Sequence, residues 1–358
     1  MRIFLTSDWH IGIYQLNLTK WIKRQEEFIY DFFIPLIKKE MKPGDILIHL
    51  GDLYDNRSYI DIKAMNFAEK VVSDISDIIP FHLIVGNHDM YNKSSGDINS
   101  VNLFKYMKNV KVYNSPTVLD LNGKKCVLMP WINSTKKQIE IINKFKPADY
   151  LFCHSDLNGC KMHMNSVSHM SKDRIDLKHF RAFNKVYAGH IHIVQDQDNF
   201  TFVGSPMQYD RGDYKDKKGV FILNVENGTH EFFENTVSPV FEKIEIIKDE
   251  DLELLENVNF DNYVDLKVSN NLLIKNNKLR RKLEKLMEDN NFSKVEYIND
   301  VEKSVKKEEE SLEDFDFSDI KEIEKVVLKY IESKKWGSEK IRTGILKEYE
   351  EILKIYKN

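Results

Sequence analysis

Five apolar, strand-like segments in the first half of this 358-residue chain are each followed at once by metal-coordinating residue types. The segments are Ile3 to Thr6, Ile46 to Leu50, Leu83 to Val85, Tyr150 to Cys153 and Val186 to Ala188. In an open α/β sheet, ligands bind in the loops beyond the carboxyl ends of the strands. The pattern therefore predicts an α/β protein in which five loops converge on one site.

The residues in these loops offer oxygen and imidazole nitrogen, and no thiolate takes part. The expected metal ligands are Asp8, His10, Asp52, Asn87, His154, His190 and His192. Such a mixed set suits manganese, iron or zinc better than calcium or magnesium. We expect two divalent ions, with Mn²⁺ as the leading candidate. Two carboxylates do not cancel four positive charges, so the site is expected to attract a phosphodiester.

Within this site, bridging and acid catalysis are assigned to separate residues. Paired catalytic ions lie roughly 3.5 to 4 Å apart, so one carboxylate must bridge them, and Asp52 is the candidate. His88 directly follows the ligand Asn87, which places its ring over the phosphate, where it can protonate a leaving alkoxide. A carboxylate from Asp55 or Asp89 is expected to orient that ring. The predicted catalytic residues are therefore His88 and Asp55.

At these residues the chain resembles the calcineurin-like metallophosphoesterases. Within them it is most similar to the nuclease subunit of SbcCD-type double-strand-break repair complexes and, closer still, to the recombination endonuclease subunit of T-even phages. Gly204-Ser205-Pro206 also resembles this nuclease branch. The resemblance implies a two-sheet sandwich flanked by helices. It assigns Asp8, His10, Asp52 and His192 to one ion, and Asp52, Asn87, His154 and His190 to the other.

The same resemblance implies a DNA nuclease that acts as an exonuclease on duplex ends and as an endonuclease on single-stranded or hairpin DNA. Its context would be DNA end processing, recombination and repair. The cellular nucleases often carry a histidine where this chain has Asp55, so the balance between the two activities stays open. A phosphatase or small-molecule phosphodiesterase of the same superfamily is the alternative. Asp89 speaks against it, because protein phosphatases usually have glutamate there.

Composition narrows the partners and the compartment. A formal charge of −4 argues against a uniformly basic nucleic-acid-binding surface, so DNA contacts must come from local patches or from a partner. The three cysteines, Cys126, Cys153 and Cys160, form no CxxC pair, which fits a reducing cytoplasm, or the host cytoplasm for a phage protein. No apolar run reaches the roughly 18 residues that cross a bilayer, so no membrane association is expected.

Residues 1–236 are expected to form the metallophosphoesterase nuclease domain. Helical stretches from Trp21 to Met41 and from Asp61 to Ile79 separate the first metal-binding loops. Asn122-Gly123 predicts a tight hairpin between Thr117 to Leu121 and Lys125 to Met129. A second hairpin, from Gly219 to Val225 and from Thr229 to Phe233, is expected to close the domain.

Residues 237–300 predict a small α+β capping domain. Its expected strands are Phe241 to Ile247, Tyr263 to Val268 and Lys294 to Ile298, with a helix from Leu273 to Met287. Five basic residues lie in or beside that helix, namely Lys275, Lys278, Arg280, Arg281 and Lys282. They fit a DNA-binding patch and a solvated helix face equally well.

Residues 301–316 are mostly charged and predict a tether, while residues 317–358 predict a helical hairpin with two apolar faces. Those faces could fold back on the catalytic domain or bind a coiled coil. The resemblance favours the second alternative, because these nuclease subunits bind an SMC-like coiled-coil ATPase. It also implies a homodimer within a heterotetramer.

The remaining histidines carry no ligand spacing. His49, His82 and His230 lie within predicted strands and are expected to be packing or surface residues. His163, His169 and His179 follow the fourth motif, in and after a Met- and Ser-rich stretch, and we expect a mobile surface loop there.

Overall fold

The structure, a computed structural model, describes residues 1–13, 18–92, 95–163, 166–167, 170–256, 259, 261–277, 279–281, 283–284 and 294–298, with isolated positions in the last twenty residues. The predicted tether and almost all of the predicted helical tail therefore lie outside the described residues, as does His169. The chain divides into two compact units. The first comprises residues 1–268 and 272–297 and contains both six-stranded sheets and the helices that cover them.

The first of two six-stranded sheets has the strand order β16-β15-β1-β2-β3-β6. Its strands are β1 (Arg2–Thr6), β2 (Ile46–His49), β3 (Phe81–Ile84), β6 (Val110–Tyr113), β15 (Gly219–Asn224) and β16 (His230–Glu234). The four strands from β1 to β6 are parallel, and the β15–β16 hairpin is added antiparallel beside β1. The predicted closing hairpin is thus part of the first sheet.

The second sheet has the order β13-β14-β12-β9-β8-β7. Its strands are β7 (Thr117–Leu121), β8 (Lys124–Met129), β9 (Ala148–His154), β12 (Phe183–Gly189), β13 (Gln195–Gln197) and β14 (Phe200–Phe202). Strands β8, β9, β12 and β14 are parallel, and antiparallel strands flank them on both sides. Two short hairpins lie outside both sheets, β4 (Met90–Asn92) with β5 (Ser95–Asn99) and β10 (Lys161–His163) with β11 (Ser166–Val167).

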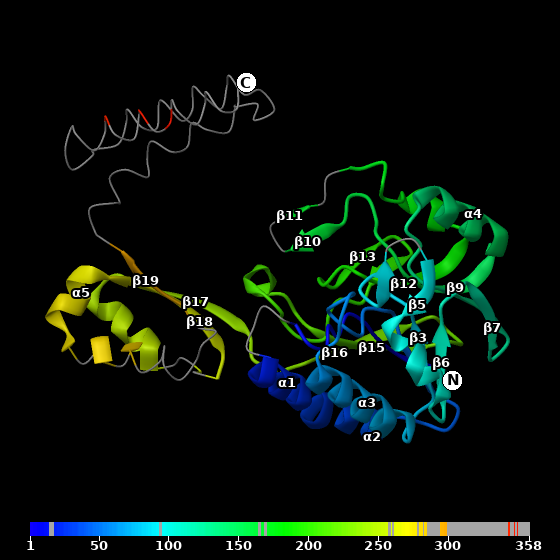
Figure 1. Cartoon of the computed structure of the whole chain (residues 1–358), viewed down its shortest axis with the longest axis horizontal. Coiled ribbons are helices and arrows are strands. Elements are labelled where there is room, and N and C mark those ends of the chain that lie inside the picture. Colours follow the sequence, from blue (N-terminus) through cyan, green and yellow to red (C-terminus); the bar gives the residue numbers. More distant parts are fainter. Residues whose placement is uncertain are drawn as a thin grey trace. The chain divides into compact units, whose positions relative to one another are not determined.

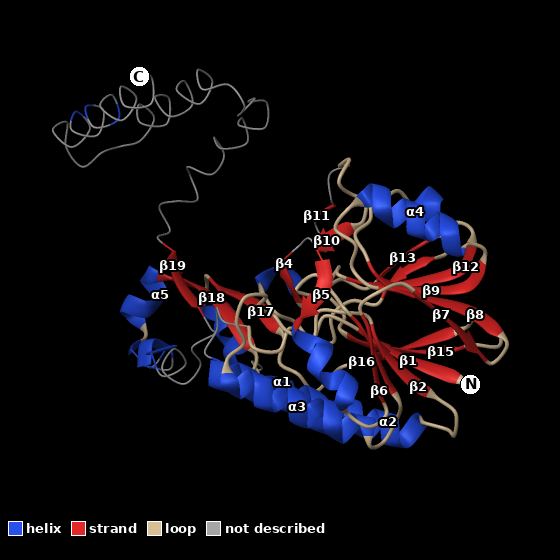
Figure 2. Cartoon of the chain, turned by 45° about the vertical axis from the view of Figure 1, so that its right-hand side comes forward, coloured by secondary structure: helices blue, strands red, loops and turns tan. Residues whose placement is uncertain are grey.

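The two sheets pack face to face between helices, as Figures 1 and 2 show. Side chains of β1 alternate between the two layers: Ile3 and Leu5 pack between the sheets with Phe152, whereas Phe4 packs under the helices with Trp21. The helices on the first sheet are α1 (Leu18–Glu27), α2 (Ile34–Glu40) and α3 (Ile62–Ser76), and α4 (Thr135–Phe145) covers the second. The predicted two-sheet sandwich flanked by helices is confirmed.

The helix predicted from Trp21 to Met41 is not a uniform α-helix. A π-helical segment, η1 (Phe28–Phe33), separates α1 from α2. Pro35 lies in the first turn of α2 and has no amide hydrogen, so the chain cannot keep the regular α-helical bond at this position. By contrast, α3 begins as expected, because Asp61 accepts a capping hydrogen bond from the Lys63 amide at 2.8 Å.

The small predicted domain forms a three-stranded sheet of β17 (Phe241–Ile246), β18 (Tyr263–Ser269) and β19 (Lys294–Ile298). Phe241 and Tyr263 join the hydrophobic core that contains Trp21, so this sheet packs on the helical side of the first six-stranded sheet. The helix expected from residue 273 begins earlier, as α5 (Asn270–Lys275), and residue 276 interrupts it. Four short segments of the chain are 3-10 helices, namely η2 (Ser100–Tyr106), η3 (Leu177–Phe180), η4 (Arg211–Asp213) and η5 (Asp249–Glu256).

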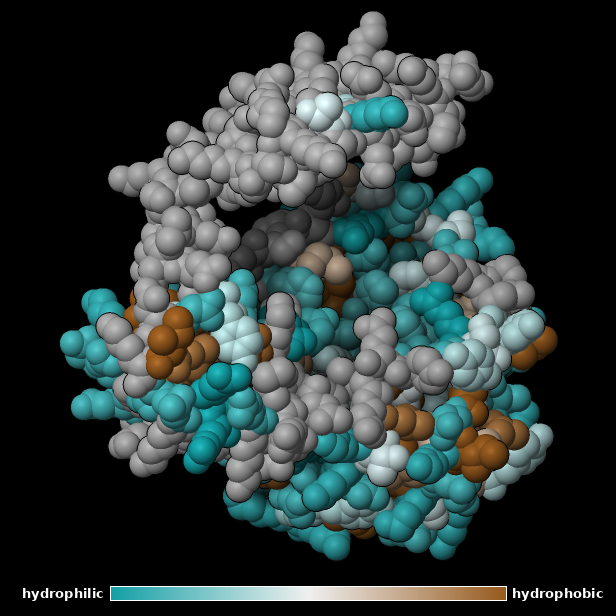
Figure 3. All heavy atoms as spheres, turned by 60° about the vertical axis from the view of Figure 1, so that its left-hand side comes forward, coloured by the Kyte–Doolittle hydropathy of each residue, from teal (hydrophilic) through white to brown (hydrophobic). Residues whose placement is uncertain are grey.

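The described surface is largely hydrophilic, with separate hydrophobic patches on the side shown in Figure 3. Large apolar side chains that face solvent include Ile62 at the start of α3, which is 70% exposed, and Tyr106 at the end of η2, which is 80% exposed. Of the predicted basic patch, Arg280 pairs with Glu284 at 3.1 Å along the same helix. No helix among the described residues is long and apolar enough to span a bilayer.

Candidate metal centre

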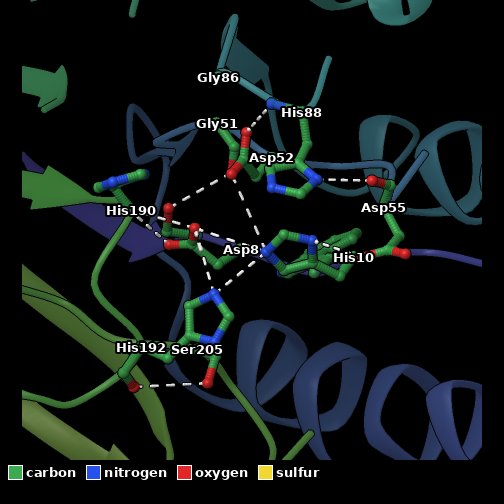
Figure 4. A network of polar contacts seen from close by, with 12 residues as sticks. Asp8, His10, Gly51, Asp52, Asp55, Gly86, His88, His190, His192 and Ser205 are labelled. Atoms are coloured by element: carbon green, nitrogen blue, oxygen red, sulfur yellow. Dashed lines mark hydrogen bonds and ion pairs between the residues drawn. The ribbon is translucent and has the colours of Figure 1, made fainter. Parts of the chain in front are cut away.

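All seven predicted ligands lie at the carboxyl ends of parallel strands. Asp8 and His10 follow β1, Asp52 follows β2, and Asn87 follows β3 in the first sheet. In the second sheet, His154 is the last residue of β9, and His190 and His192 follow β12. Because both sheets present these ends to the same place, residues more than 180 positions apart are in contact. Figure 4 shows five of them, Asp8, His10, Asp52, His190 and His192, gathered in one place.

One cluster consists of Asp8, His10 and His192. Each offers a ligand atom, and these atoms all lie within 4.8 Å of one another. The Nε2 atoms of His10 and His192 are 3.1 Å apart, and each lies 3.8 to 3.9 Å from the same oxygen of Asp8. Asp52 Oδ2 lies 3.9 Å from His10 Nε2. Two nitrogens and two carboxylates thus face a common point.

The second cluster consists of Asp52, His154 and His190. Asp52 Oδ2 lies 3.3 Å from His154 Nε2, and Asn87 Oδ1 lies 2.8 Å from both His154 Nε2 and His190 Nδ1. Asp52 is therefore the carboxylate that adjoins both clusters. This is the position that a bridging ligand needs, and the mixed nitrogen and oxygen donors fit two divalent cations.

The backbone around the centre is held in an unusual conformation. Four of the seven predicted ligands have a positive φ: Asp8 (53°), His10 (44°), Asp52 (57°) and His190 (93°). Residues other than glycine rarely adopt such angles, which persist only where the surrounding structure enforces them. Gly51, with φ 108°, is also required, since a Cβ there would lie 2.5 Å from His154 Nδ1.

Hydrogen bonds, burial and nearby carboxylates set the charge of the imidazoles, and they act differently on different rings. His154 Nδ1 lies 2.7 Å from the Leu50 carbonyl oxygen, which requires a proton on Nδ1 and turns Nε2 toward Asp52. Burial lowers the pKa of His190 to about 3 and that of His192 well below its usual value, so both are neutral ligands. Burial opposes a charge on Asp52, yet His154 and His10 hold the pKa of Asp52 well below its usual value.

His88 lies beside this centre, but its orienting partner differs from the one predicted. Its Nδ1 lies 2.6 Å from the backbone carbonyl oxygen of Asp55, and its amide donates to Asp52 Oδ1 at 2.7 Å. The Asp55 carboxylate instead lies 3.2 Å from His10 Nδ1. The loop after β2 turns the Asp55 side chain toward His10, and His10, Asp55 and His88 form a further group whose potential ligand atoms lie within 4.8 Å of one another.

Asp89 does not orient His88 either; it fixes the backbone of the second and third motifs. One carboxylate oxygen accepts from the amides of Asp52 and Gly86, both at 2.9 Å, and the other accepts from Leu53 at 3.0 Å and Tyr54 at 3.2 Å. Through the bond from the Asp52 amide, Asp89 holds Asp52 in place. Burial, together with the nearby Asp52 carboxylate, raises the pKa of Asp89 to about 7.

Three further residues support the centre although no motif in the sequence identifies them. The Tyr209 hydroxyl donates to the carbonyl oxygen of Asp8 at 2.6 Å. The Lys218 ammonium donates to the carbonyl oxygen of His192 at 2.8 Å. The Trp131 ring packs on the His190 ring at a centroid distance of 4.8 Å. Each acts across a long sequence separation, which spacing alone does not reveal.

The strand histidines behave as expected. His49 packs edge-on against Trp9 at 4.8 Å, and His82 and His230 pair with the hydroxyls of Tyr113 and Tyr187. The cysteines Cys126, Cys153 and Cys160 are free and buried.

The family described as calcineurin-like phosphoesterase matches residues 1–194. The chain belongs to this family. It is therefore a metal-dependent hydrolase of the phosphoesterase superfamily, and the two clusters are its candidate sites for divalent ions.

The chain is similar to two viral proteins and, more distantly, to a solved structure. The chain is 31% identical to exonuclease subunit 1 of Enterobacteria phage T4 over 247 residues, which cover 66% of this chain and 69% of the relative. It is 28% identical to putative phosphoesterase 078R of Invertebrate iridescent virus 3, over 50% of this chain and 54% of the relative. A solved archaeal phosphodiesterase matches 66% of this chain and 100% of its own at 11% identity, with a TM-score of 0.33.

The four amide contacts of Asp89 generate a prediction. Asp89→Asn keeps the shape but presents an NH₂ group to one pair of backbone N–H donors. We expect affinity for divalent ions to fall about 10- to 100-fold, as is typical when a group that orients metal ligands is lost. Titration calorimetry with Mn²⁺ measures this, and Asp31→Asn on the exposed surface is the matched control. Equal affinities in both variants would show that Asp89 does not position Asp52.

Proposed function

We propose that this chain is a two-metal-dependent DNA nuclease that acts with an SMC-like ATPase in DNA end processing, recombination and repair. The observation that carries the proposal is the Asp52 carboxylate adjoining both ligand clusters, with His88 beside it. The similarity to a phage protein named as an exonuclease subunit supports DNA as the substrate. Exonuclease action on duplex ends and endonuclease action on single-stranded or hairpin DNA remain part of this proposal.

When bound, two divalent ions would supply positive charge and activate water for attack on phosphorus. Asp8, His10, Asp52 and His192 would hold one ion, and Asp52, Asn87, His154 and His190 the other. The Leu50 carbonyl accepts from His154 Nδ1 and holds that imidazole in one tautomer. The Asp55 carboxylate lies 3.2 Å from His10 Nδ1 and favours positive charge on that ring.

His88 is positioned to act on the leaving group. Because its Nδ1 proton is directed to the Asp55 carbonyl, Nε2 carries a proton only when the ring is charged. Burial lowers the pKa of His88, while Asp52 opposes this effect. Protonation of the His88 ring is therefore favoured by nearby negative charge, which a bound phosphodiester supplies. The protonated ring then donates its Nε2 proton to the leaving alkoxide.

Metal dependence is the first test. We expect chelated protein to be inactive on end-labelled duplex and single-stranded DNA, Mn²⁺ to restore cleavage and Mg²⁺ to restore it weakly, because imidazole nitrogens dominate the ligand set. A chromogenic diester is assayed in parallel. Full activity with Mg²⁺ alone would contradict the proposed manganese preference, and cleavage of the diester without cleavage of DNA would favour the small-molecule phosphodiesterase alternative.

The role of His88 has a separate test. We expect His88→Asn to bind both ions with unchanged affinity and to cleave DNA about 10² to 10⁴ times more slowly, the usual contribution of a general acid. Metal content and single-turnover rates are measured on the same samples, with His179→Asn as the control. Loss of metal would make His88 a ligand, and an unchanged rate would remove it from the mechanism.

The partner proposal rests on the amino-acid sequence of the tail. Apolar residues recur at helical spacing in two segments beyond the charged tether, and such faces bind grooves or coiled coils. We propose that they bind the coiled coil of an SMC-like ATPase, within a heterotetramer that contains two copies of this chain.

Truncation after Glu310 tests the tail. The compact unit formed by residues 1–268 and 272–297 contains the metal centre, so we expect the melting temperature and Mn²⁺-dependent cleavage of single-stranded DNA to be unchanged. Co-purification with the ATPase, and ATP-dependent stimulation on duplex DNA, should be lost. If the truncated chain loses basal cleavage, the tail belongs to the catalytic core; if it still binds the ATPase, the docking surface lies elsewhere.

A further inference from the structure

A second group of potential ligands lies outside the catalytic clusters. His163 in β10, Asp213 in η4 and Asp216 shortly after it each offer one ligand atom, and these atoms all lie within 4.8 Å of one another. Asp213 and Asp216 are only 1% and 5% exposed. His163 was expected in a mobile surface loop, whereas it lies in β10 beside two buried carboxylates.

Three buried polar atoms in this group have no hydrogen-bond partner among the described residues. They are His163 Nδ1 and both carboxylate oxygens of Asp216. Buried polar atoms in native proteins are nearly always paired, so an unpaired set that shares one location indicates a missing partner. A cation bound between His163 and Asp216 would pair all three.

The local charge favours a cation. The Lys218 ammonium lies 2.7 Å from Asp213 Oδ1 and also donates to the His192 carbonyl, whereas it lies 3.7 Å from Asp216 Oδ2. One ammonium thus pairs with two carboxylates, more closely with Asp213 than with Asp216, and one negative charge in the group stays unbalanced. Burial raises the pKa of Asp216 to about 6, with Lys218 opposing the rise, so this carboxylate is ionised at neutral pH. Burying an unbalanced charge is unfavourable unless an ion neutralises it.

The backbone at residue 212 permits the imidazole to approach. A Cβ on Gly212 would lie 2.6 Å from His163 Cε1 and 2.7 Å from His163 Nδ1, closer than real Cβ contacts allow. The ring therefore packs directly against the backbone of η4, which brings Nδ1 to the carboxylates. Asp213 is fixed as well, because its other oxygen accepts from the Tyr209 amide at 2.8 Å.

We propose that His163, Asp213 and Asp216 bind a divalent cation that is distinct from the catalytic pair. One imidazole and two carboxylates suit zinc or manganese, with water completing the coordination. The ion fastens β10 to the segment that carries Lys218, and Lys218 in turn supports the His192 loop. Its role is structural, and it does not depend on which phosphoester the catalytic centre hydrolyses.

Metal counting on the full chain tests this inference. After dialysis against Zn²⁺ or Mn²⁺ and removal of free metal, we expect His163→Ala and Asp216→Asn each to retain one ion fewer per chain than the wild type, as measured by mass spectrometry of the metal. His179→Ala, a half-buried histidine outside all the clusters, should retain the wild-type number. Anomalous diffraction at the metal edge should place the additional ion between His163 and Asp216.

Thermal melting of each variant separates loss of the ion from loss of the fold. Should His163→Ala disrupt the hairpin, Asp216→Asn, which preserves side-chain shape, still decides the question. Equal metal content in the wild type and in a folded Asp216→Asn variant would overturn the proposal. So would anomalous maps with density only at the catalytic clusters, since a water molecule or a proton shared by the two carboxylates would then fill the site.

Discussion

The carboxylate of Asp52 is the contact through which the two halves of the metal centre are joined. It is buried beyond the end of β2, between the cluster of Asp8, His10 and His192 and the cluster that includes His154 and His190. Such a charge is stable only because imidazoles surround it and because Asp89 fixes the backbone on which it lies. The rest of the site is arranged around this one buried anion.

Positioning the ligands requires backbone conformations that the chain would not adopt by itself. Asp8, His10, Asp52 and His190 all have positive φ, and each follows a strand that is fully hydrogen-bonded within its sheet. Regular strands thus hold strained loops, which is how folded proteins maintain such conformations at functional sites. The large cores on both sides of the sheets supply the stability that offsets this strain.

Support for the centre extends into the segment that follows the last metal motif. Tyr209 donates to the carbonyl of Asp8, and Lys218 donates to the carbonyl of His192, so two of the four predicted ligands of one ion are connected to the same stretch of chain. Asp213 joins these contacts, since it accepts from the Tyr209 amide and pairs with Lys218. A change in this segment would therefore reach the centre through backbone carbonyls without touching a ligand side chain.

The order of apolar segments and polar motifs along the chain was sufficient to predict the fold class and the convergence of the seven ligand candidates. Strands are recognised by short apolar runs, and parallel strands direct their carboxyl ends to one edge, so motifs such as Asp8-Trp9-His10 must converge. The hairpin at Asn122-Gly123 was predictable for the same reason, because its turn chemistry is local. The π-helical segment before Pro35 was missed, because the apolar periodicity continues through it.

Only the tertiary structure decided which side chains meet within and beside the centre. Asp55 was expected at His88, yet its carboxylate lies at His10, because the direction of a side chain in a loop depends on packing and not on spacing. His163 carried no ligand spacing and nevertheless lies with Asp213 and Asp216, from a distant segment. A sequence fixes what each residue can do chemically, whereas the loops and sheets determine the few ångströms that decide which partner it has.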